Sequence, residues 1–230
     1  MNLVFSSLFI LLHFFYQPVN KNNLYYLHKA SSLNEKAPLL ILLHGVGSNE
    51  KDLFSFASQI PNKYHVISLR APFVLGEESF AWYQVDFINS KPHINAKQAE
   101  ASRIMLIEFL ENLKSDFKYD ASQVYLCGFS QGAIMSYSVA LSRPDLVKGF
   151  AAMSGRLLDE HKVSFASDEK LSKLKILITH GTHDPVLHVD YAKQAALFLK
   201  DKGMKPELKL YEEGHTINEA MLIELINWLK

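Results

Sequence analysis

The chain has 230 residues, 48% of them apolar, with 24 basic and 24 acidic side chains. This length and composition are enough for one substantial hydrophobic core and match the size of a single domain. Because the charges balance, no net field attracts nucleic acid or another polyanion, and we expect no nucleic-acid partner. The single cysteine, Cys127, cannot form an internal disulfide, which fits a reducing compartment or a fold without covalent cross-links.

The first feature along the chain is an apolar run from Leu3 to Tyr16. The run is too short for a stable bilayer span, which needs about 20 apolar residues. No Lys or Arg precedes it, and no small-residue cleavage site follows before Pro18. We therefore interpret residues 1–17 as an N-terminal extension of a cytoplasmic domain formed by residues 18–230. An export signal or membrane tether formed by residues 3–16 is the alternative.

Beyond Pro18, predicted strands alternate with predicted helices, which is the pattern of an α/β fold with a mostly parallel central sheet. Short aliphatic or β-branched runs predict strands at 24–28, expected at a sheet edge, and at 39–43, 65–69, 123–126, 150–153, 174–179 and 207–211. Apolar residues at helical spacing and flanking breakers predict helices at 49–58, 96–117, 131–141, 191–200 and 217–229. The aromatic stretch 80–87 has no assigned conformation, and the charged stretch 160–173 is expected to be a surface connection.

The strongest chemical signal is the motif Gly128-Phe129-Ser130-Gln131-Gly132, between a predicted strand and a predicted helix. A serine hydroxyl is a weak nucleophile and must be exposed toward a base and a substrate. A sharp strand-to-helix turn exposes it, and glycines relieve the crowding in that turn. The pattern therefore predicts that Ser130 is a catalytic nucleophile. A Gly/Ser turn that only joins the two elements is the alternative.

A serine nucleophile needs a histidine base and a carboxylate, which follow it in the order Ser, Asp, His in this kind of site. Asp184 lies just after the strand at 174–179, and His215 lies between the last strand and the last helix. Loops at the carboxyl ends of strands are where α/β sheets place functional groups. We predict that His215 is the general base and that Asp184 orients it. A loop histidine with satisfied hydrogen bonds and a helix N-cap aspartate are the alternatives.

Two backbone N–H groups are candidates for an oxyanion hole. The loop His44-Gly45-Val46-Gly47 follows the strand at 39–43 and can present the N–H of Val46. Gln131 follows the nucleophile and begins a helix, so its N–H and the helix dipole favour the same anion. The same glycines could instead only close a tight turn.

Three further features have mainly structural interpretations. The group His180, His183, Asp184 and His188 resembles a metal cluster, but its spacing matches no zinc motif, and we expect no metal. Cys127 ends a buried strand and is interpreted as a small hydrophobic residue rather than a nucleophile. Trp82 either walls a substrate pocket or packs in the core, and the sequence leaves both interpretations open.

These motifs resemble those of the phospholipase/carboxylesterase family, the bacterial relatives of acyl-protein thioesterases. The resemblance runs from Leu39 to the chain end and rests on Leu43-His44-Gly45-Val46-Gly47 with Glu50 and Asp52-Leu53, Gly128 to Ala133, His180 to Val186, and Gly214-His215. It implies an α/β-hydrolase fold without a large lid domain, no cofactor, and action on carboxylic esters. It also assigns catalysis to Ser130, Asp184 and His215, and oxyanion binding to Val46 and Gln131.

The chain departs from the family pattern at Leu187-His188, where the family usually has an aliphatic residue and proline. This loop lines the site, so Leu187 joins Trp82 as a candidate substrate-binding residue. We expect a serine hydrolase that cleaves a small-molecule ester or thioester through an acyl-enzyme on Ser130, and a homodimer stays open. The alternatives are a non-catalytic acyl- or protein-binding module and a dienelactone-type hydrolase, which would favour cysteine at position 130.

Overall fold

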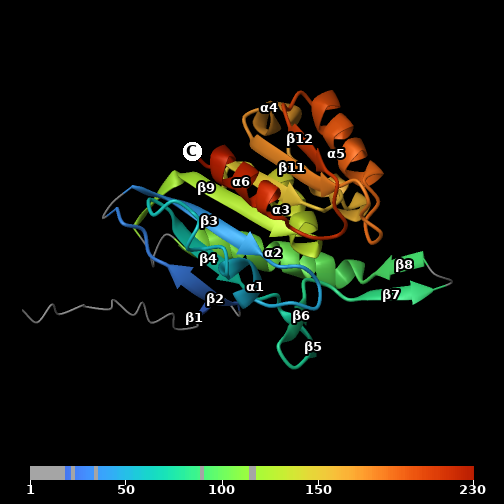
Figure 1. The fold of residues 1–230 in the computed structure, drawn as a ribbon, viewed down its shortest axis with the longest axis horizontal. Helices are drawn as coiled ribbons and strands as arrows, with labels where there is room; N and C mark the ends of the chain where they lie inside the picture. Colours follow the sequence, from blue (N-terminus) through green and yellow to red (C-terminus); the bar gives the residue numbers. More distant parts are fainter. Residues whose placement is uncertain (1–18, 22–23, 34–35, 89–90, 114–117) are drawn as a thin grey trace, which may run out of the picture.

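A computed structural model describes residues 19–21, 24–33, 36–88, 91–113 and 118–230 (Figure 1). Its centre is an eight-stranded sheet, in which six neighbouring strands, β4 to β12 in the order below, run parallel. Across the sheet the strands are β1 (Val19–Lys21), β2 (Leu24–Lys29), β4 (His65–Leu69), β3 (Ala37–Leu43), β9 (Tyr119–Phe129), β10 (Gly149–Met153), β11 (Lys175–Gly181) and β12 (Glu207–Tyr211). The predicted mostly parallel α/β fold is therefore confirmed.

Helices cover both faces of this sheet. The described helices are α1 (Lys51–Phe54), α2 (Ala96–Asn112), α3 (Gln131–Ser142), the 3-10 helix η2 (Asp159–Ser164), α4 (Asp168–Leu171), α5 (Asp190–Asp201) and α6 (Glu219–Trp228). Side chains of α2, α3 and α5 pack in one hydrophobic cluster, and those of α1 and α6 pack in a second. In β3, Leu39, Ile41 and Leu43 belong to the first cluster, and Leu40 and Leu42 to the second. Burial on both faces explains why such strands are continuous aliphatic runs in the sequence.

The structure corrects several predicted boundaries. Strand β2 is not at the sheet edge, because β1 pairs with it in antiparallel register on its outer side. The helix predicted at 49–58 is a single turn, α1, followed by hydrogen-bonded turns up to Gln59. The helix predicted at 96–117 ends at Asn112, and residues 114–117 lie outside the described residues.

The aromatic stretch at 80–87 contributes to two hairpins outside the main sheet. These hairpins pair β5 (Phe73–Gly76) with β6 (Ser79–Ala81), and β7 (Val85–Ile88) with β8 (Lys91–Ile94). Figure 1 shows both projecting from the body of the molecule. The apolar run of residues 3–16 and the proposed boundary at residue 18 lie outside the described residues. Within the described part of the chain, no helix has the length and apolarity required to cross a bilayer.

The parallel strands bring the predicted site residues to one edge of the sheet. The loop that contains Val46 follows β3, and Ser130 follows β9. Asp184 follows β11, and His215 follows β12. Because all four strands point the same way, their carboxyl ends share this edge.

Candidate active site

Ser130 lies in a strained turn between β9 and α3. Its backbone has φ 53° and ψ −116°, a conformation that residues with a side chain rarely adopt. A Cβ atom on Gly128 would lie 2.2 Å from the carbonyl oxygen of Gly132, and one on Gly132 would lie 1.9 Å from that of Leu43. Only glycine fits at either position. The N–H of Ser130 donates to the carbonyl of Met153 at 2.9 Å, which anchors the turn to β10.

The structure brings the side chains of Ser130, His215 and Asp184 together. Oγ of Ser130 lies 2.9 Å from Nε2 of His215, and Nδ1 of His215 lies 2.6 Å from Oδ2 of Asp184. Because an ionised carboxylate can only accept, Nδ1 carries the proton and Nε2 is free to accept from the serine hydroxyl. This is the arrangement that a serine nucleophile with a histidine base requires.

Asp184 is held by its surroundings in the ionised form. Burial raises the pKa of its carboxyl. Hydrogen bonds from His215 and from the backbone N–H groups of Leu187 and Val186 together lower this pKa by a larger amount, so the net shift is downward. Both N–H groups donate to Oδ1 at 2.8 Å. Leu187 therefore positions Asp184 through its backbone, while its half-buried side chain packs against the core. A contact between Leu187 and substrate stays a prediction.

Of the nearby histidines, His180 at the end of β11 also contacts Asp184, with its Nε2 3.3 Å from Oδ2, whereas His183 and His188 do not. Nε2 of His180 is buried and donates to the carbonyl of Leu187 at 2.7 Å, and burial lowers the pKa of His180, so its ring is neutral. His183 and His188 are exposed and lie beside Glu212 and Asp190. Among the residues that the structure describes, no three His, Cys, Asp or Glu side chains are grouped to hold a metal ion.

Cys127 is part of the core. Its side chain is buried beside the sulfur of Met153, and burial raises the pKa of its thiol to about 12. A thiol with that pKa is protonated at neutral pH and is a poor nucleophile.

The loop of Val46 packs against the nucleophile turn. A Cβ on Gly45 would lie 3.3 Å from the ring of Phe129 and 3.4 Å from Cβ of Ser130. Gly47 has φ 82°, and its N–H donates to the carbonyl of Phe80 at 2.8 Å. Neither the N–H of Val46 nor that of Gln131 donates to another group in the described part of the chain. Both donors are thus available to an oxyanion, although that role stays a prediction.

Comparisons with known proteins identify the family of this chain. The family model described as Phospholipase/Carboxylesterase matches residues 29–230. The chain belongs to this family. The carboxylesterase SOBER1 of Arabidopsis thaliana is 32% identical over 108 residues, which cover 46% of this chain and 47% of that protein. Acyl-protein thioesterase 1 of Candida albicans is 26% identical over 212 residues, which cover 83% of this chain and 90% of that protein.

Solved structures confirm the α/β-hydrolase fold of the family. A carboxylesterase from Mesorhizobium loti has a TM-score of 0.80 at 20% identity, covering 93% of this chain and 98% of that one. The esterase PE8 has a TM-score of 0.76 at 25% identity, covering 88% and 95%. In sequence, the chain spans less than half the length of SOBER1 and of the similar plant carboxylesterases that it matches.

In this phospholipase/carboxylesterase family member, the side chain of Gln131 has a structural task that the sequence did not reveal. Its Oε1 accepts from the N–H of Trp82 at 2.7 Å, and its Nε2 donates to the carbonyl of Tyr83 at 2.7 Å. Each buried amide group that lost such a partner would cost about 1–3 kcal/mol. Gln131 thus ties the segment after β6 to the start of α3. These hydrogen bonds could not be predicted from the sequence, because the partners lie almost fifty positions apart.

The side chain of Trp82 is packed in the core. Its side chain is fully buried, and its indole N–H donates to the carbonyl of His44 at 2.9 Å. His44 in turn accepts from the N–H of Ala71 at Nε2 and donates from Nδ1 to the carbonyl of Gly45. Burial lowers the pKa of His44 more than its hydrogen bond to Gly45 raises it, which fits this neutral tautomer. Trp82 therefore packs beneath the loop of Val46, as the core interpretation expects, and a contact between Trp82 and substrate stays a prediction.

A buried ion pair fixes the other end of the same loop. Glu50 is 1% exposed and accepts two hydrogen bonds of 2.6 Å from Arg70, which follows β4. Burial raises the pKa of Glu50, but the hydrogen bonds and charge of Arg70, a backbone hydrogen bond and the charge of Lys51 together lower it by more. The guanidinium also lies 4.6 Å from the ring centre of Phe80. These contacts join α1, β4 and β6 around the loop that follows β3.

Proposed function

We propose that this protein hydrolyses carboxylic esters or thioesters through an acyl-enzyme on Ser130. The observation that carries the proposal is the continuous hydrogen-bond chain from Oγ of Ser130 through His215 to the buried carboxylate of Asp184. A chance meeting of three loops would not also place the serine in a strained turn that points it toward the base. Family membership and the named activities of the relatives support the same reaction class.

The geometry suggests a two-stage reaction. His215 takes the proton of Ser130 as Oγ attacks the acyl carbonyl, and Asp184 stabilises the imidazolium that forms. The oxyanion of the tetrahedral intermediate is held by the N–H groups of Val46 and Gln131, the second at the amino end of α3. His215 then returns its proton to the departing alcohol or thiol. In the second stage His215 deprotonates water, which attacks the acyl-enzyme, and His215 then returns the proton to Oγ of Ser130 as the carboxylic acid leaves.

The test is reaction with a fluorophosphonate probe and burst kinetics with p-nitrophenyl butyrate. The wild type is expected to label rapidly, and Ser130→Ala should lose labelling and about 10⁴-fold or more of its turnover. Ser154→Ala is the matched control, because Ser154 also follows a parallel strand with φ 50° but its hydroxyl has no hydrogen-bond partner in the described residues. It should label like the wild type.

Two outcomes would reject the proposal. Full activity in Ser130→Ala would remove the nucleophile, and an unreactive wild type would favour the rival function, a non-catalytic module that binds acyl groups or a protein. If the enzyme is active, p-nitrophenyl esters of increasing chain length, compared with an acyl thioester, will define the acyl group and the leaving group.

A further inference from the structure

Lysines gather at the sheet edge opposite the candidate active site. Each of the six parallel strands begins one or two residues after an exposed lysine. We call these lysines the lysine row: Lys36 (β3), Lys63 (β4), Lys118 (β9), Lys148 (β10), Lys173 (β11) and Lys205 (β12). Because parallel strands begin at one edge, the six side chains line that edge together. In contrast, no lysine occurs within five residues after the end of any of these strands.

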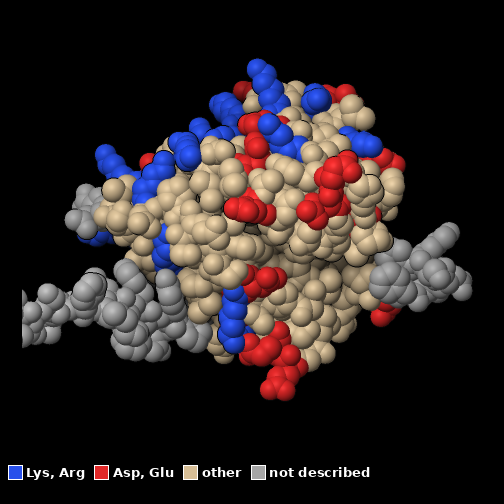
Figure 2. Space-filling model, in the orientation of Figure 1, with Lys and Arg blue, Asp and Glu red and all other residues tan. Residues whose placement is uncertain are grey.

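The lysines of this neutral chain are therefore segregated in space, whereas two arginines, Arg70 and Arg156, follow β4 and β10 at the opposite edge. Figure 2 shows Lys and Arg atoms gathered on the side of the molecule where β3 and β9 begin in Figure 1. With strands about 4.8 Å apart, the row is roughly 24 Å long. Neighbouring strands are closer together than the Debye length of about 8 Å at physiological salt, so the fields of lysines on adjacent strands overlap. The balanced composition excludes only a net electrostatic field of the whole molecule, whereas the lysine row produces a local positive field.

Acidic residues offset the row only in part, because Asp120 lies close enough to Lys36 for the lysine charge to lower its pKa. Among the described residues, no member of the row makes an ion pair; the lysines that do are Lys51, Lys162, Lys193, Lys202 and Lys209. Asp120, Asp145 and Glu207 lie at the same edge. Asp145 is already paired with Arg143 at 2.7 Å, and Asp120 accepts hydrogen bonds from Ser122.

Stabilisation of helix ends does not account for the row. Cations favour the carboxyl ends of helices, which also lie at this edge, but the effect falls off within the last turn. Lys118 lies six residues beyond the end of α2, and Lys148 lies six residues beyond the end of α3. The row needs another explanation.

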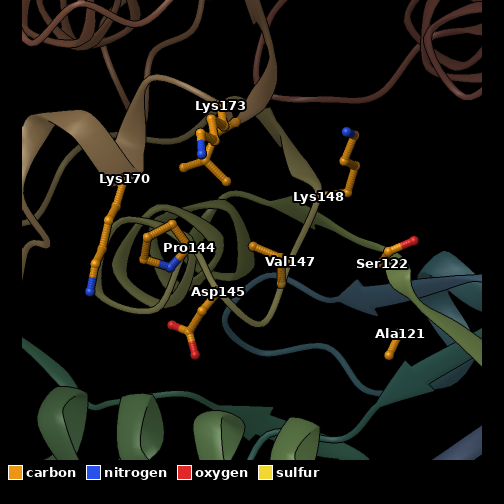
Figure 3. Close-up of a pocket in the computed structure, with 9 residues that line it drawn as sticks. Ala121, Ser122, Pro144, Asp145, Val147, Lys148, Lys170 and Lys173 are labelled. Atoms are coloured by element: carbon orange, nitrogen blue, oxygen red, sulfur yellow. The ribbon is translucent and has the colours of Figure 1, made fainter.

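The shape of the edge indicates what it can bind. Lys148, Lys170 and Lys173 line a surface pocket of about 200 Å³ together with Asp145. Figure 3 shows Lys148 and Lys170 on opposite sides of this pocket, with their ammonium groups extending in different directions. They do not converge on one small anion. Point charges spread along a broad edge suit an extended surface that carries many separate anionic groups.

We propose that the lysine row docks the protein on an anionic lipid surface, with the candidate active site facing away from it. Clustered lysines bind such surfaces additively, and an apolar segment is the second signal that stable anchoring needs. The run from Leu3 to Tyr16 is such a segment in the sequence. Strand β1, which follows it, runs in the same direction as the six parallel strands, so the chain enters the sheet from the side of the row. Nucleic acid would explain the lysines but not the apolar run.

The test is sedimentation of the full chain with vesicles of phosphatidylcholine, alone or mixed with phosphatidylserine. The wild type is expected to bind the anionic vesicles at least about tenfold more tightly, and added salt should abolish this preference. A variant without four members of the row should lose the preference: Lys118→Gln, Lys148→Gln, Lys173→Gln and Lys205→Gln. A matched control with the same charge change should keep it: Lys51→Gln, Lys97→Gln, Lys162→Gln and Lys193→Gln.

Three results would overturn the proposal. Equal preference in the two variants would make net charge, and not the row, responsible for binding. Equal binding of the wild type to both kinds of vesicle would leave the apolar run as the only membrane contact. Tighter row-dependent binding to duplex DNA than to anionic vesicles would point to nucleic acid instead. Unfolding midpoints of both variants exclude misfolding, and no readout uses ester hydrolysis, so the result is independent of the proposed function.

Discussion

The two halves of the candidate active site are fixed by different kinds of interaction. The nucleophile turn from Gly128 to Gly132 is fixed by steric fit, because Cβ atoms at either glycine would overlap the backbone. The acid–base loops, residues 181–187 and 213–216, are fixed by hydrogen bonds, three of which reach Asp184. Steric fit contributes at one point, because a Cβ atom on Gly181 would lie 2.3 Å from the carbonyl oxygens of Glu213 and Gly214, whereas a Cβ atom on Gly214 would meet no other atom within 4 Å. Substitutions in the turn should therefore affect folding, and substitutions in the loops, Gly181 excepted, should affect chemistry.

The largest expected effect is the loss of activity in Asp184→Asn, a substitution in the acid–base loops that should leave the fold stable. The asparagine oxygen can still accept from Val186 and Leu187, so the loop keeps its shape. Its NH₂ group, however, donates to Nδ1 of His215, which places the proton on Nε2, where it cannot accept from Ser130. We expect kcat for a p-nitrophenyl ester to fall about 10³- to 10⁴-fold, with the free energy of unfolding changed by less than about 2 kcal/mol.

Asp190→Asn is the control for that measurement. Asp190 also lies beside a histidine, His188, at 3.1 Å, but both side chains are exposed. Its amide variant should retain wild-type kcat. If Asp184→Asn kept more than about a tenth of the activity, His215 would not depend on the carboxylate for its tautomer.

The next largest effect is expected in the turn, for Gly132→Ala. The new methyl group would lie 1.9 Å from the carbonyl oxygen of Leu43, so β3 or α3 must move. We expect a loss of about 3 kcal/mol or more in the free energy of unfolding by denaturant, together with the loss of activity. Gly214→Ala meets no neighbouring atom and should change the free energy of unfolding by less than about 1 kcal/mol. Equal losses in the two variants would mean that steric fit does not distinguish the halves.

Whether a feature depends on neighbouring or on distant residues decides whether the sequence could predict it. The aliphatic run at 39–43 predicts a strand because both its faces are buried, and the spacing of Gly128, Ser130 and Gly132 predicts the turn because only glycine fits there. Asp184 and His215 could be placed from their positions after strands. Such features depend on neighbours in the chain, so local patterns are enough to find them.

Features that depend on distant partners could not be predicted. The bonds of Gln131 to the segment after β6, and the burial of Trp82, require knowing which loops meet. The pairing of β1 outside β2 rests on three residues with no hydrophobic pattern. The lysine row was visible in the sequence only as scattered residues, because its alignment needs the parallel order of the strands.

The smallest expected effect is on the pH dependence of stability. It tests whether the loss of stability in acid arises at the candidate active site or at a buried histidine outside it. His28 in β2 lies 3.0 Å from Nδ1 of His65, and burial, with a smaller effect of His65, lowers the pKa of His28 from 6.5 to about 4. The unfolded chain therefore binds a proton between these pH values that the folded chain does not. Stability is complete above about pH 6.5 and falls as the pH decreases toward 4, by about 1–2 kcal/mol after allowing for partial exposure.

Denaturant titrations across this pH range check the assignment. In His28→Gln the free energy of unfolding should vary less with pH than in the wild type. Asp184→Asn should keep the wild-type slope, because the pKa of Asp184 is shifted downward, out of this range. Any loss of activity in that range without loss of folded protein then belongs to the acid–base loops. If His28→Gln kept the full slope, acid sensitivity would have to arise at another buried histidine, such as His44 or His180 beside the site.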